Sequence, residues 1–179
     1  MPEFETRLAS ANDLPRLMSM DHGSRSDYVW QLELRREPNQ MTAAFREVRL
    51  PRSVEVKYPR NALALADEWM KRDAVLVAQN ECLLVGYACL VEEHTSAIAW
   101  MTDLVVTTEW RRRGAGSALL EAGQAWALER GVKRLVLEVT SKNQGGIRLA
   151  QKFGYEFCGY NDQYYPNQDV ALFFGRALK

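Results

Sequence analysis

The segment Arg111-Arg112-Arg113-Gly114-Ala115-Gly116 has residue types and spacing suited to holding a phosphate group. It lies between a strongly apolar strand candidate and a predicted helix. Its two glycines permit a tight turn with no Cβ to block a ligand. The helix that follows presents unpaired N–H groups at the positive end of its dipole, and three arginines add cationic charge. The segment therefore predicts a site where a phosphate is held largely by backbone.

Two familiar phosphate-binding patterns do not fit this segment. A P-loop requires a lysine and a hydroxyl residue together after its second glycine, and that pair is missing. A dinucleotide-binding loop requires a third small residue at the position where Leu119 stands. The structural alternative is a basic, glycine-containing loop that holds no ligand, because short motifs recur by chance.

Glu138 is the second residue that could do chemistry. It interrupts the apolar strand candidate Leu135-Val136-Leu137-Glu138-Val139, out of phase with Leu135, Leu137 and Val139. A carboxylate on such a strand is costly unless it has partners or a role, so it is either a functional group or part of an ion-pair network. Asp103, on the preceding strand candidate, is a second choice and could equally be structural.

The elements that must position these residues alternate between strands and helices in the second half of the chain. Strands are predicted at residues 74–79, 83–92, 97–106, 134–140, 155–160 and 170–178. Gly86 lies inside the second of these and suggests a bulge or a close backbone approach. Helices are predicted from Ala115 to a stop at Gly131 and from Gln144 to Phe153. This order predicts an α/β (α+β) fold, a mixed twisted sheet flanked by helices.

The first half of the chain adds further elements. A strand over residues 4–9 is followed by a short helix that Ser10 caps. Extended segments at Tyr28–Leu34 and Thr42–Leu50 predict a β-hairpin, and a third extended piece lies between Pro51 and Pro59. Residues 62–72 read as a helix with one apolar stripe, made of Leu63, Ala66 and Met70.

Size and composition predict one domain spanning residues 1–179. The chain has 179 residues, formal net charge +0, 47% hydrophobic and 26% charged residues. Net neutrality argues against a nucleic-acid partner, and no apolar run reaches the roughly 20 residues of a membrane helix. The acidic N-terminus lacks a signal-peptide stretch, so a cytoplasmic location is expected. Cys82, Cys89 and Cys158 match no zinc spacing and are expected to be small buried hydrophobes.

A longer ordered series gives the loop a known context. Thr102 to Val106 precedes Arg111-x-x-Gly114-x-Gly116 by five residues, and residues 135–139, Asn143 and Phe153-Gly154-Tyr155 follow in order. Val85-Gly86-Tyr87 adds a strand glycine. This series, over roughly residues 74–178, resembles the Gcn5-related N-acetyltransferases (GNAT). Within that family, it is most similar to the ribosomal-protein alanine N-acetyltransferases.

The resemblance implies that acetyl-coenzyme A is the cosubstrate and that no metal takes part. Its pyrophosphate would lie on the glycine loop, and its pantetheine arm would enter a gap between two splayed strands and pair with backbone. The implied cofactor-binding residues are Leu104, Val105, Val106, Arg111, Arg112, Arg113, Gly114, Ala115, Gly116, Ser117 and Asn143. The structural alternatives are sheet core for the three strand residues and a helix cap for Asn143.

For catalysis, the resemblance implies that Glu138 is the base that frees the attacking amine of its proton. The sequence departs from the family at Ala150, where relatives have a tyrosine that protonates the departing thiolate. The thiolate could leave unaided, water could fill the space, or Tyr164 or Tyr165 could reach in from the closing loop. A further reading is that the protein binds the cofactor and catalyses poorly.

The expected function is transfer of an acetyl group to a primary amine by direct attack. The acceptor would be a protein or peptide N-terminus or a small amine such as an aminoglycoside-like or streptothricin-like antibiotic. Trp30, Tyr164 and Tyr165 would suit a cation, although each could be core. The rival from another class is a non-catalytic acyl-coenzyme A sensor. A homodimer through exposed strands and the extra hairpin is a further expectation.

Overall fold

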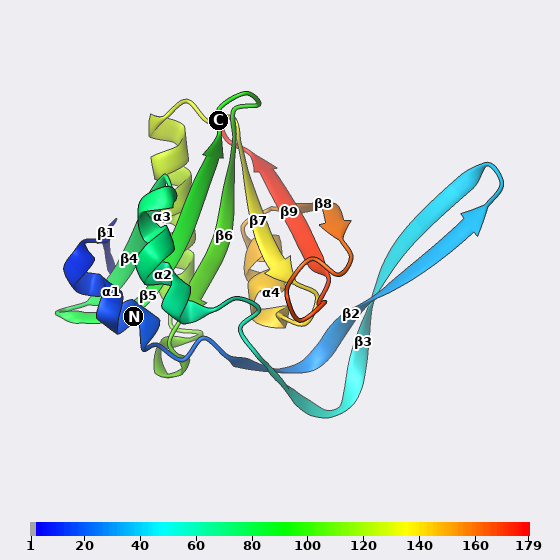
Figure 1. Ribbon diagram of the computed structural model, residues 1–179, viewed down its shortest axis with the longest axis horizontal. Coiled ribbons are helices and arrows are strands. Elements are labelled where there is room, and N and C mark those ends of the chain that lie inside the picture. The colour runs from blue at the N-terminus through cyan, green and yellow to red at the C-terminus, as the bar shows by residue number, and fades with distance from the viewer. Residues whose placement is uncertain (1–2) are drawn as a thin grey trace.

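The computed structural model describes residues 3–179, and a seven-stranded mixed sheet forms its body (Figure 1). The strand order is β1-β4-β5-β6-β7-β9-β8. Neighbours are antiparallel except β6 and β7, which are parallel. The strands are β1 (Glu5–Leu8), β4 (Ala74–Asn80), β5 (Leu83–Glu93), β6 (Ile98–Val106), β7 (Arg134–Thr140), β8 (Glu156–Asn161) and β9 (Ala171–Ala177). The predicted mixed sheet is confirmed.

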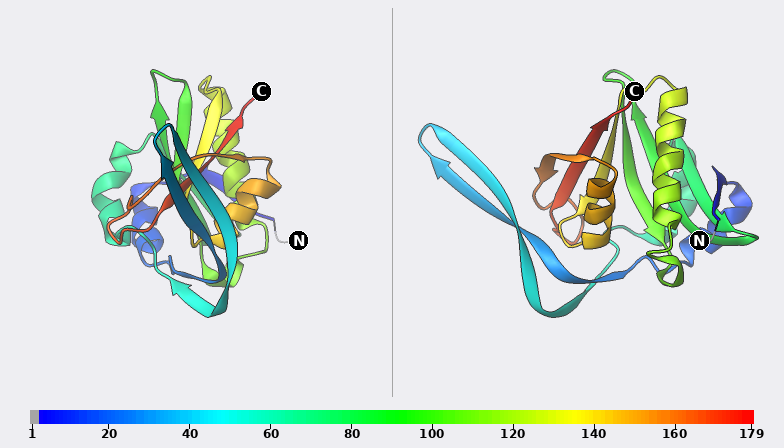
Figure 2. Two further views of the ribbon diagram at one scale, coloured as in Figure 1. Left: turned by 90° about the vertical axis from the view of Figure 1, so that its right-hand side faces the viewer. Right: turned by 180° about the vertical axis from the view of Figure 1, so that it is seen from behind.

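Helices cover both faces of this sheet, as Figures 1 and 2 show from opposite sides. α3 (Ala115–Glu129) and α4 (Gln144–Lys152) lie on one face, and α1 (Leu14–Met18) and α2 (Leu65–Glu68) lie on the other. Short 3-10 turns occur at Ala11–Asp13, Ala62–Ala64, Trp69–Lys71 and Thr108–Trp110. Each face therefore has its own buried apolar cluster.

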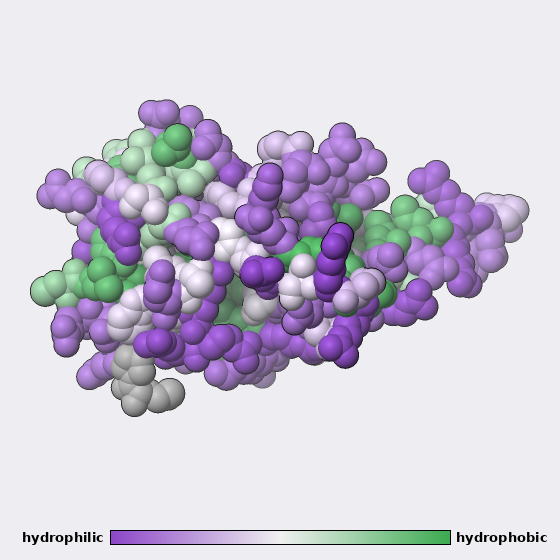
Figure 3. Space-filling view, turned by 90° about the horizontal axis from the view of Figure 1, so that it is seen from below, coloured by the Kyte–Doolittle hydropathy of each residue, from purple (hydrophilic) through white to green (hydrophobic). Residues whose placement is uncertain are grey.

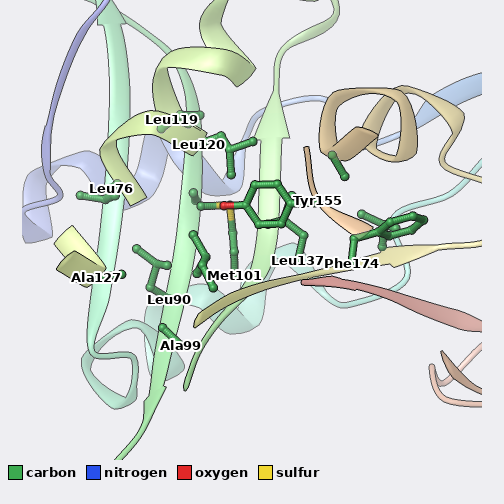
Figure 4. Packing of buried hydrophobic residues seen from close by; sticks show 14 of the residues in the cluster. Leu76, Leu90, Ala99, Met101, Leu119, Leu120, Ala127, Leu137, Tyr155 and Phe174 are labelled. Atoms are coloured by element: carbon green, nitrogen blue, oxygen red, sulfur yellow. The ribbon is translucent and has the colours of Figure 1, made fainter. Parts of the chain in front are cut away.

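The larger cluster lies under α3 (Figure 4). Leu119 and Leu120 of the helix are fully buried there together with Leu90 and Met101 of the sheet. A Cβ on Gly123 would come within 2.5 Å of Met101 Cε, so a larger residue in the helix would require the end of this methionine side chain to move. This packing fixes where the N-terminus of α3 points.

β6 and β7 are paired for only about half of their length and then diverge. Their pairing runs from Ile98↔Arg134 to Met101↔Leu137 and stops there. The last residues of both strands, 102–106 and 138–140, have no partner in the other strand. The sheet is therefore open between the two strands at the end where the glycine loop begins (Figure 1). The splay expected from the resemblance is confirmed.

Gly86 in β5 lies against this open end. A Cβ at this position would stand 2.5 Å from the carbonyl oxygen of Val105 in β6. The β4–β5 ladder also shifts register next to it, between Ala78 and Gln79. Both the bulge and the close backbone approach predicted from the sequence are present.

The β2–β3 hairpin is longer than predicted and projects from the body (Figures 1 and 2). β2 (Ser24–Glu37) and β3 (Gln40–Val56) form a separate two-stranded sheet with a two-residue turn at residues 38–39. We call its outer part, from Tyr28 to Arg49, the arm. The separate extended piece expected after Pro51 was wrong, because those residues continue β3 and pair with the start of β2.

Two further expectations were wrong. Residues 62–72 do not form one helix, and Leu63 and Met70 are 68% and 76% exposed, while Leu65 faces the core. Cys89 is buried as expected, but Cys82 and Cys158 are exposed. In residues 3–179, no helix is long and apolar enough to cross a membrane.

Candidate active site

The opening between β6 and β7 continues into a cleft of about 1290 Å³. Its walls come from the ends of both strands, the glycine loop, the start of α4 and the base of the β2–β3 hairpin. Figure 3 views the molecule from this end and shows hydrophilic residues interspersed with hydrophobic ones over both the body and the arm. The cleft therefore joins the predicted phosphate loop to the predicted base.

The glycine loop has the geometry of an anion site. Gly114 caps α3 in the left-handed region at φ 106°, and Arg112 also has a positive φ of 61°. Within residues 3–179, no backbone carbonyl accepts a hydrogen bond from the amides of residues 112–117. Unpaired amides at the start of a 15-residue helix form a ready site for phosphate.

The three loop arginines differ in what their side chains do. Arg111 donates to the carbonyl oxygens of Val106 (2.8 Å), Asp21 (3.1 Å) and Gly23 (2.6 Å). It therefore fastens the loop to β6 and to the segment before β2. The exposed Arg113 stacks over Trp110 at 5.5 Å, and Arg112 is also exposed. These two guanidinium groups are the ones available to a ligand.

The three strand residues predicted to hold the pantetheine arm also differ, in the direction that their backbone groups face. Thr107 donates across the ladder to Val85, so the alternation of an antiparallel pair turns the backbone of Val105 toward β5. The backbone groups of Leu104 and Val106 then face the opening, and the Val106 carbonyl is already bound by Arg111. The Val105 side chain is buried, so its part is mainly structural.

Asn143 caps a helix and also lies at the wall of the cleft. Its side chain caps α4 by accepting from the Gly146 amide at 3.0 Å. The same residue lines the cleft. The cap places the N-terminus of a second helix at the cleft wall.

Glu138 lies at the point where the strands part and is paired with an arginine. Its Oε1 accepts from Nη2 of Arg60, and its Oε2 accepts from the hydroxyl of Tyr164 at 3.2 Å. The other nitrogen of Arg60, Nη1, donates to Asp103 Oδ1 (3.2 Å) and to the carbonyl of Thr102 (3.0 Å). One guanidinium thus bridges two buried carboxylates, one from each strand.

Tyrosines and a histidine extend this network on the α1 side of the sheet. Tyr58 donates to Asp103 Oδ1 at 2.5 Å, and Tyr87 lies 3.0 Å from Nε2 of His22. Burial, followed by the Asp103 charge, raises the pKa of Tyr58 well above its ordinary range. Burial also lowers the pKa of His22. At neutral pH these groups are therefore uncharged.

The position of the missing tyrosine is closed off. Ala150 lies on the core-facing side of α4, is fully buried and does not line the cleft. Tyr164 is engaged with Glu138, and burial raises its pKa. Tyr165 is buried beneath the Arg60 guanidinium at 5.1 Å. Trp30 packs against the core outside the cleft, so it is not one of the aromatic residues of this site.

The site has two parts, which lie at the opening between β6 and β7. One is the start of α3, whose free amides suit an anion, and the other is the pocket that holds the two carboxylates. Reasoning from the sequence missed Arg60 and Tyr58, which lie in a loop with no periodic pattern. No group of three or more metal-ligating side chains occurs in the described part of the chain. The site therefore offers amides for phosphate and carboxylates for a cation.

Comparisons with known proteins agree with this geometry. The model of the acetyltransferase (GNAT) family matches residues 36–155. Streptothricin acetyltransferase of Streptomyces lavendulae is 31% identical over 94 residues, which are 52% of this chain and 46% of that protein. The ribosomal protein bS18-alanine N-acetyltransferase of Escherichia coli K12 is 34% identical over 71 residues, 40% of this chain and 48% of that enzyme. The matches thus span about half the length of these relatives.

A solved structure extends the likeness to the whole fold. The putative streptothricin acetyltransferase of Bacillus anthracis, determined in complex with acetyl coenzyme A, superposes with a TM-score of 0.74. The alignment covers 98% of this chain and 99% of that one at 18% identity. At this identity, the likeness establishes the shared fold.

Proposed function

Because this chain belongs to the acetyltransferase (GNAT) family, we propose that it transfers an acetyl group from acetyl-coenzyme A to a primary amine. The observation that carries the proposal is the open β6–β7 pair, with free amides at one side and Glu138 at the other. Acetyl-coenzyme A supplies the activated acetyl group as a thioester.

The glycine loop binds the cosubstrate in this proposal. The amides of Arg112, Arg113, Gly114, Ala115, Gly116 and Ser117 face its phosphates, and the outward backbone of Leu104 and Val106 holds its pantetheine arm. Arg111 and Val105 contribute by fixing the loop and the strand, and Asn143 by placing the start of α4. Fixed backbone dipoles need no reorganisation as charge develops on the thioester oxygen.

Glu138 prepares the acceptor. An ammonium group must lose a proton before its nitrogen can attack, and Glu138 accepts that proton directly or through one water. Tyr164 and Arg60 hold the carboxylate in place. With alanine at position 150, the coenzyme A thiolate leaves without a dedicated tyrosine, which is feasible because a thiolate is a fair leaving group.

The acceptor in this proposal is a peptide N-terminus or a small amine. The two relatives named above act, by their names, on streptothricin and on the alanine of a ribosomal protein. The proposed acceptor group is a primary amine, which a carboxylate pocket lined by tyrosines can receive as a cation. The proposal includes a single acetyltransferase domain over residues 1–179, with its cofactor core at about 74–178, a cytoplasmic location and a homodimer.

The first test is calorimetry with acetyl-coenzyme A, followed by thiol release against a panel of small amines and alanine-initiated peptides. Binding with release establishes the acetyltransferase, and the responsive amine names the acceptor class. Binding without release supports a non-catalytic acyl-coenzyme A sensor, which the alanine at position 150 also favours. Absence of binding would refute the assignment of the glycine loop.

A further inference from the structure

Arg60 lies in the cleft and makes several contacts that the proposed reaction does not explain. It comes from the loop between β3 and α2, far in sequence from both strands that it joins. Its side chain is about three-quarters buried, while those of Asp103 and Glu138 are almost completely buried. An arginine this enclosed is held by its partners on every side, because a buried charge without partners is costly.

The bridge lies where the backbone ladder ends. Met101↔Leu137 is the last pair of the β6–β7 ladder, and Arg60 contacts the residues that follow it on both strands. The planar fork of a guanidinium suits two carboxylates at once, which a lysine ammonium does not. Arg60 therefore replaces backbone pairing at the vertex of the cleft and fixes the separation of the two carboxylates.

The same contacts set the charge of the pocket. Two carboxylates and one guanidinium leave one net negative charge. The other titratable groups that face this cluster are His22, Tyr58, Tyr87, Cys89, Tyr164 and Tyr165. Burial lowers the pKa of His22 and raises the pKa of Cys89 and of the tyrosines, so these groups stay neutral.

We propose that Arg60 is a positioning residue that matches the acceptor pocket to a single ammonium group by holding Glu138 and Asp103 apart and cancelling one of their charges. Without Arg60, two uncompensated carboxylates would bind the ammonium more tightly but resist the loss of its proton. Without Asp103, the remaining pair would be neutral and would bind the ammonium weakly. The inference rests on the proposed acetyl transfer.

Three variants test the charge count, with thiol release measured across neutral and alkaline pH for the best acceptor of the panel. Arg60→Met should lower the KM for the amine and move the acidic limb of kcat, which reports the bound amine, to higher pH by about one unit. Asp103→Asn should raise KM and move the limb to lower pH. Arg60→Met combined with Asp103→Asn restores one negative charge and should return the limb close to its wild-type position.

A matched control separates this role from a structural one. Arg130 also forms an ion pair, with Glu92, and stacks over an aromatic ring, Trp126 at 4.9 Å, but lies on the surface away from the cleft. Arg130→Met should leave the pH profile unchanged. A loss of rate in the Arg60 and Asp103 variants without opposite shifts of the limb would overturn the proposal.

Thermal unfolding of each variant shows whether it is folded. Should Arg60→Met fail to fold, Asp103→Asn and Arg60→Lys decide the matter. Lysine keeps the charge without the fork, so the limb should stay in place while kcat falls several-fold. If the wild-type protein turns over but the acidic limbs of the variants' pH profiles do not shift, this inference alone is refuted. If the wild-type protein turns over no acceptor at all, both the proposed function and this inference are refuted.

Discussion

Glu138 is held by partners on both carboxylate oxygens, so its chemistry can be removed with little change of shape. Glu138→Gln should lower kcat/KM by roughly 100- to 10,000-fold, the usual worth of a positioned base. Acetyl-coenzyme A affinity should stay near the wild-type value, because the phosphate loop is untouched. Steady-state thiol release and calorimetry measure the two quantities.

The control for this change is Glu92→Gln, which alters a carboxylate paired with Arg130 on the surface end of β5. It should keep wild-type turnover. Full kcat/KM in Glu138→Gln over the whole pH range would rule out Glu138 as the base.

Gly114 tests the phosphate loop. Gly114→Asp adds a side chain at a φ that disfavours one and places negative charge beside the free amides, so acetyl-coenzyme A should bind about 100-fold more weakly. Gly131→Asp is the matched control, since it has a similar φ of 75° at the other end of α3 with nothing within 4 Å of its Cβ. Calorimetry should show an unchanged Kd for Gly131→Asp, and equal affinities in both variants would contradict the assignment.

The residues that could be found from the sequence were those that break a pattern. Glu138 interrupts an apolar strand and Gly114 interrupts a basic run, so both stood out. Arg60 and Tyr58 lie in an irregular loop and reach the cleft only because the chain folds back over the sheet. No local spacing could have joined Arg60 to a carboxylate 78 residues away.

Among the elements, β5 and β6 approach each other most closely at Gly86. Gly86→Ala would force its Cβ against the Val105 carbonyl and should destabilise the protein by about 1–3 kcal/mol, since backbone cannot easily give way. Differential scanning calorimetry should show a lower Tm, with weaker cosubstrate binding because the backbone of Leu104 and Val106 shifts.

Gly159→Ala serves as the comparison, because its Cβ would meet only a ring carbon of Phe173 at 3.4 Å. Its Tm should change much less. A wild-type Tm for Gly86→Ala would mean that the two strands have more freedom at this point than their close approach implies.

Elements with strong periodicity were predictable, and those set by distant contacts were not. β7 was predicted with the bounds it has, because four apolar positions in seven define it. The region around α2 was misread because the predicted stripe of Leu63, Ala66 and Met70 is exposed, while Leu65 and Trp69 turn inward. β3 runs through Pro51 because an irregular stretch of the hairpin accommodates the missing N–H.

For the molecule as a whole, one ion pair couples its stability to acid. Arg7 donates to Asp13 at 2.8 and 3.0 Å, joining β1 to the turn before α1, and this lowers the pKa of Asp13 well below its usual value. Because the pKa of Asp13 is lower in the folded state, the ion pair stabilises the folded state fully above the ordinary pKa of about 3.8. This stabilisation is lost as the pH falls toward the pKa of the folded state. The Tm gap between wild type and Asp13→Asn should be constant near neutrality and shrink below about pH 4. Thermal melts at a series of pH values measure this gap, and a constant gap in acid would contradict it.

The arm is the part of the molecule that we expect to form the contact in the proposed homodimer. One of its faces carries Leu32, Leu34, Met41 and Phe45, and Phe45 packs on Phe157 of β8 in the seven-stranded sheet at 5.5 Å. Farther out, Leu34 is 47% and Met41 84% exposed, and an isolated hairpin of this kind is marginal in water. In the proposed homodimer, a second arm covers these side chains.

Sedimentation equilibrium tests this pairing. The wild-type protein should have the mass of a dimer, and Leu34→Lys combined with Met41→Lys should have the mass of a monomer, because two buried charges would oppose association. Glu33→Lys, on the opposite face of the arm, should remain dimeric. A wild-type monomer at all concentrations would refute the homodimer.

The arm is also the part of this molecule that evolution can lengthen or shorten most freely. Its strands pair one residue against one residue from Tyr28 to the turn at residues 38–39, and the arm projects from the body (Figures 1 and 2). Adding or deleting two residues in each strand would preserve which side chains share a face. Descendants of this chain could therefore change their reach toward other molecules while inheriting the same cleft unaltered.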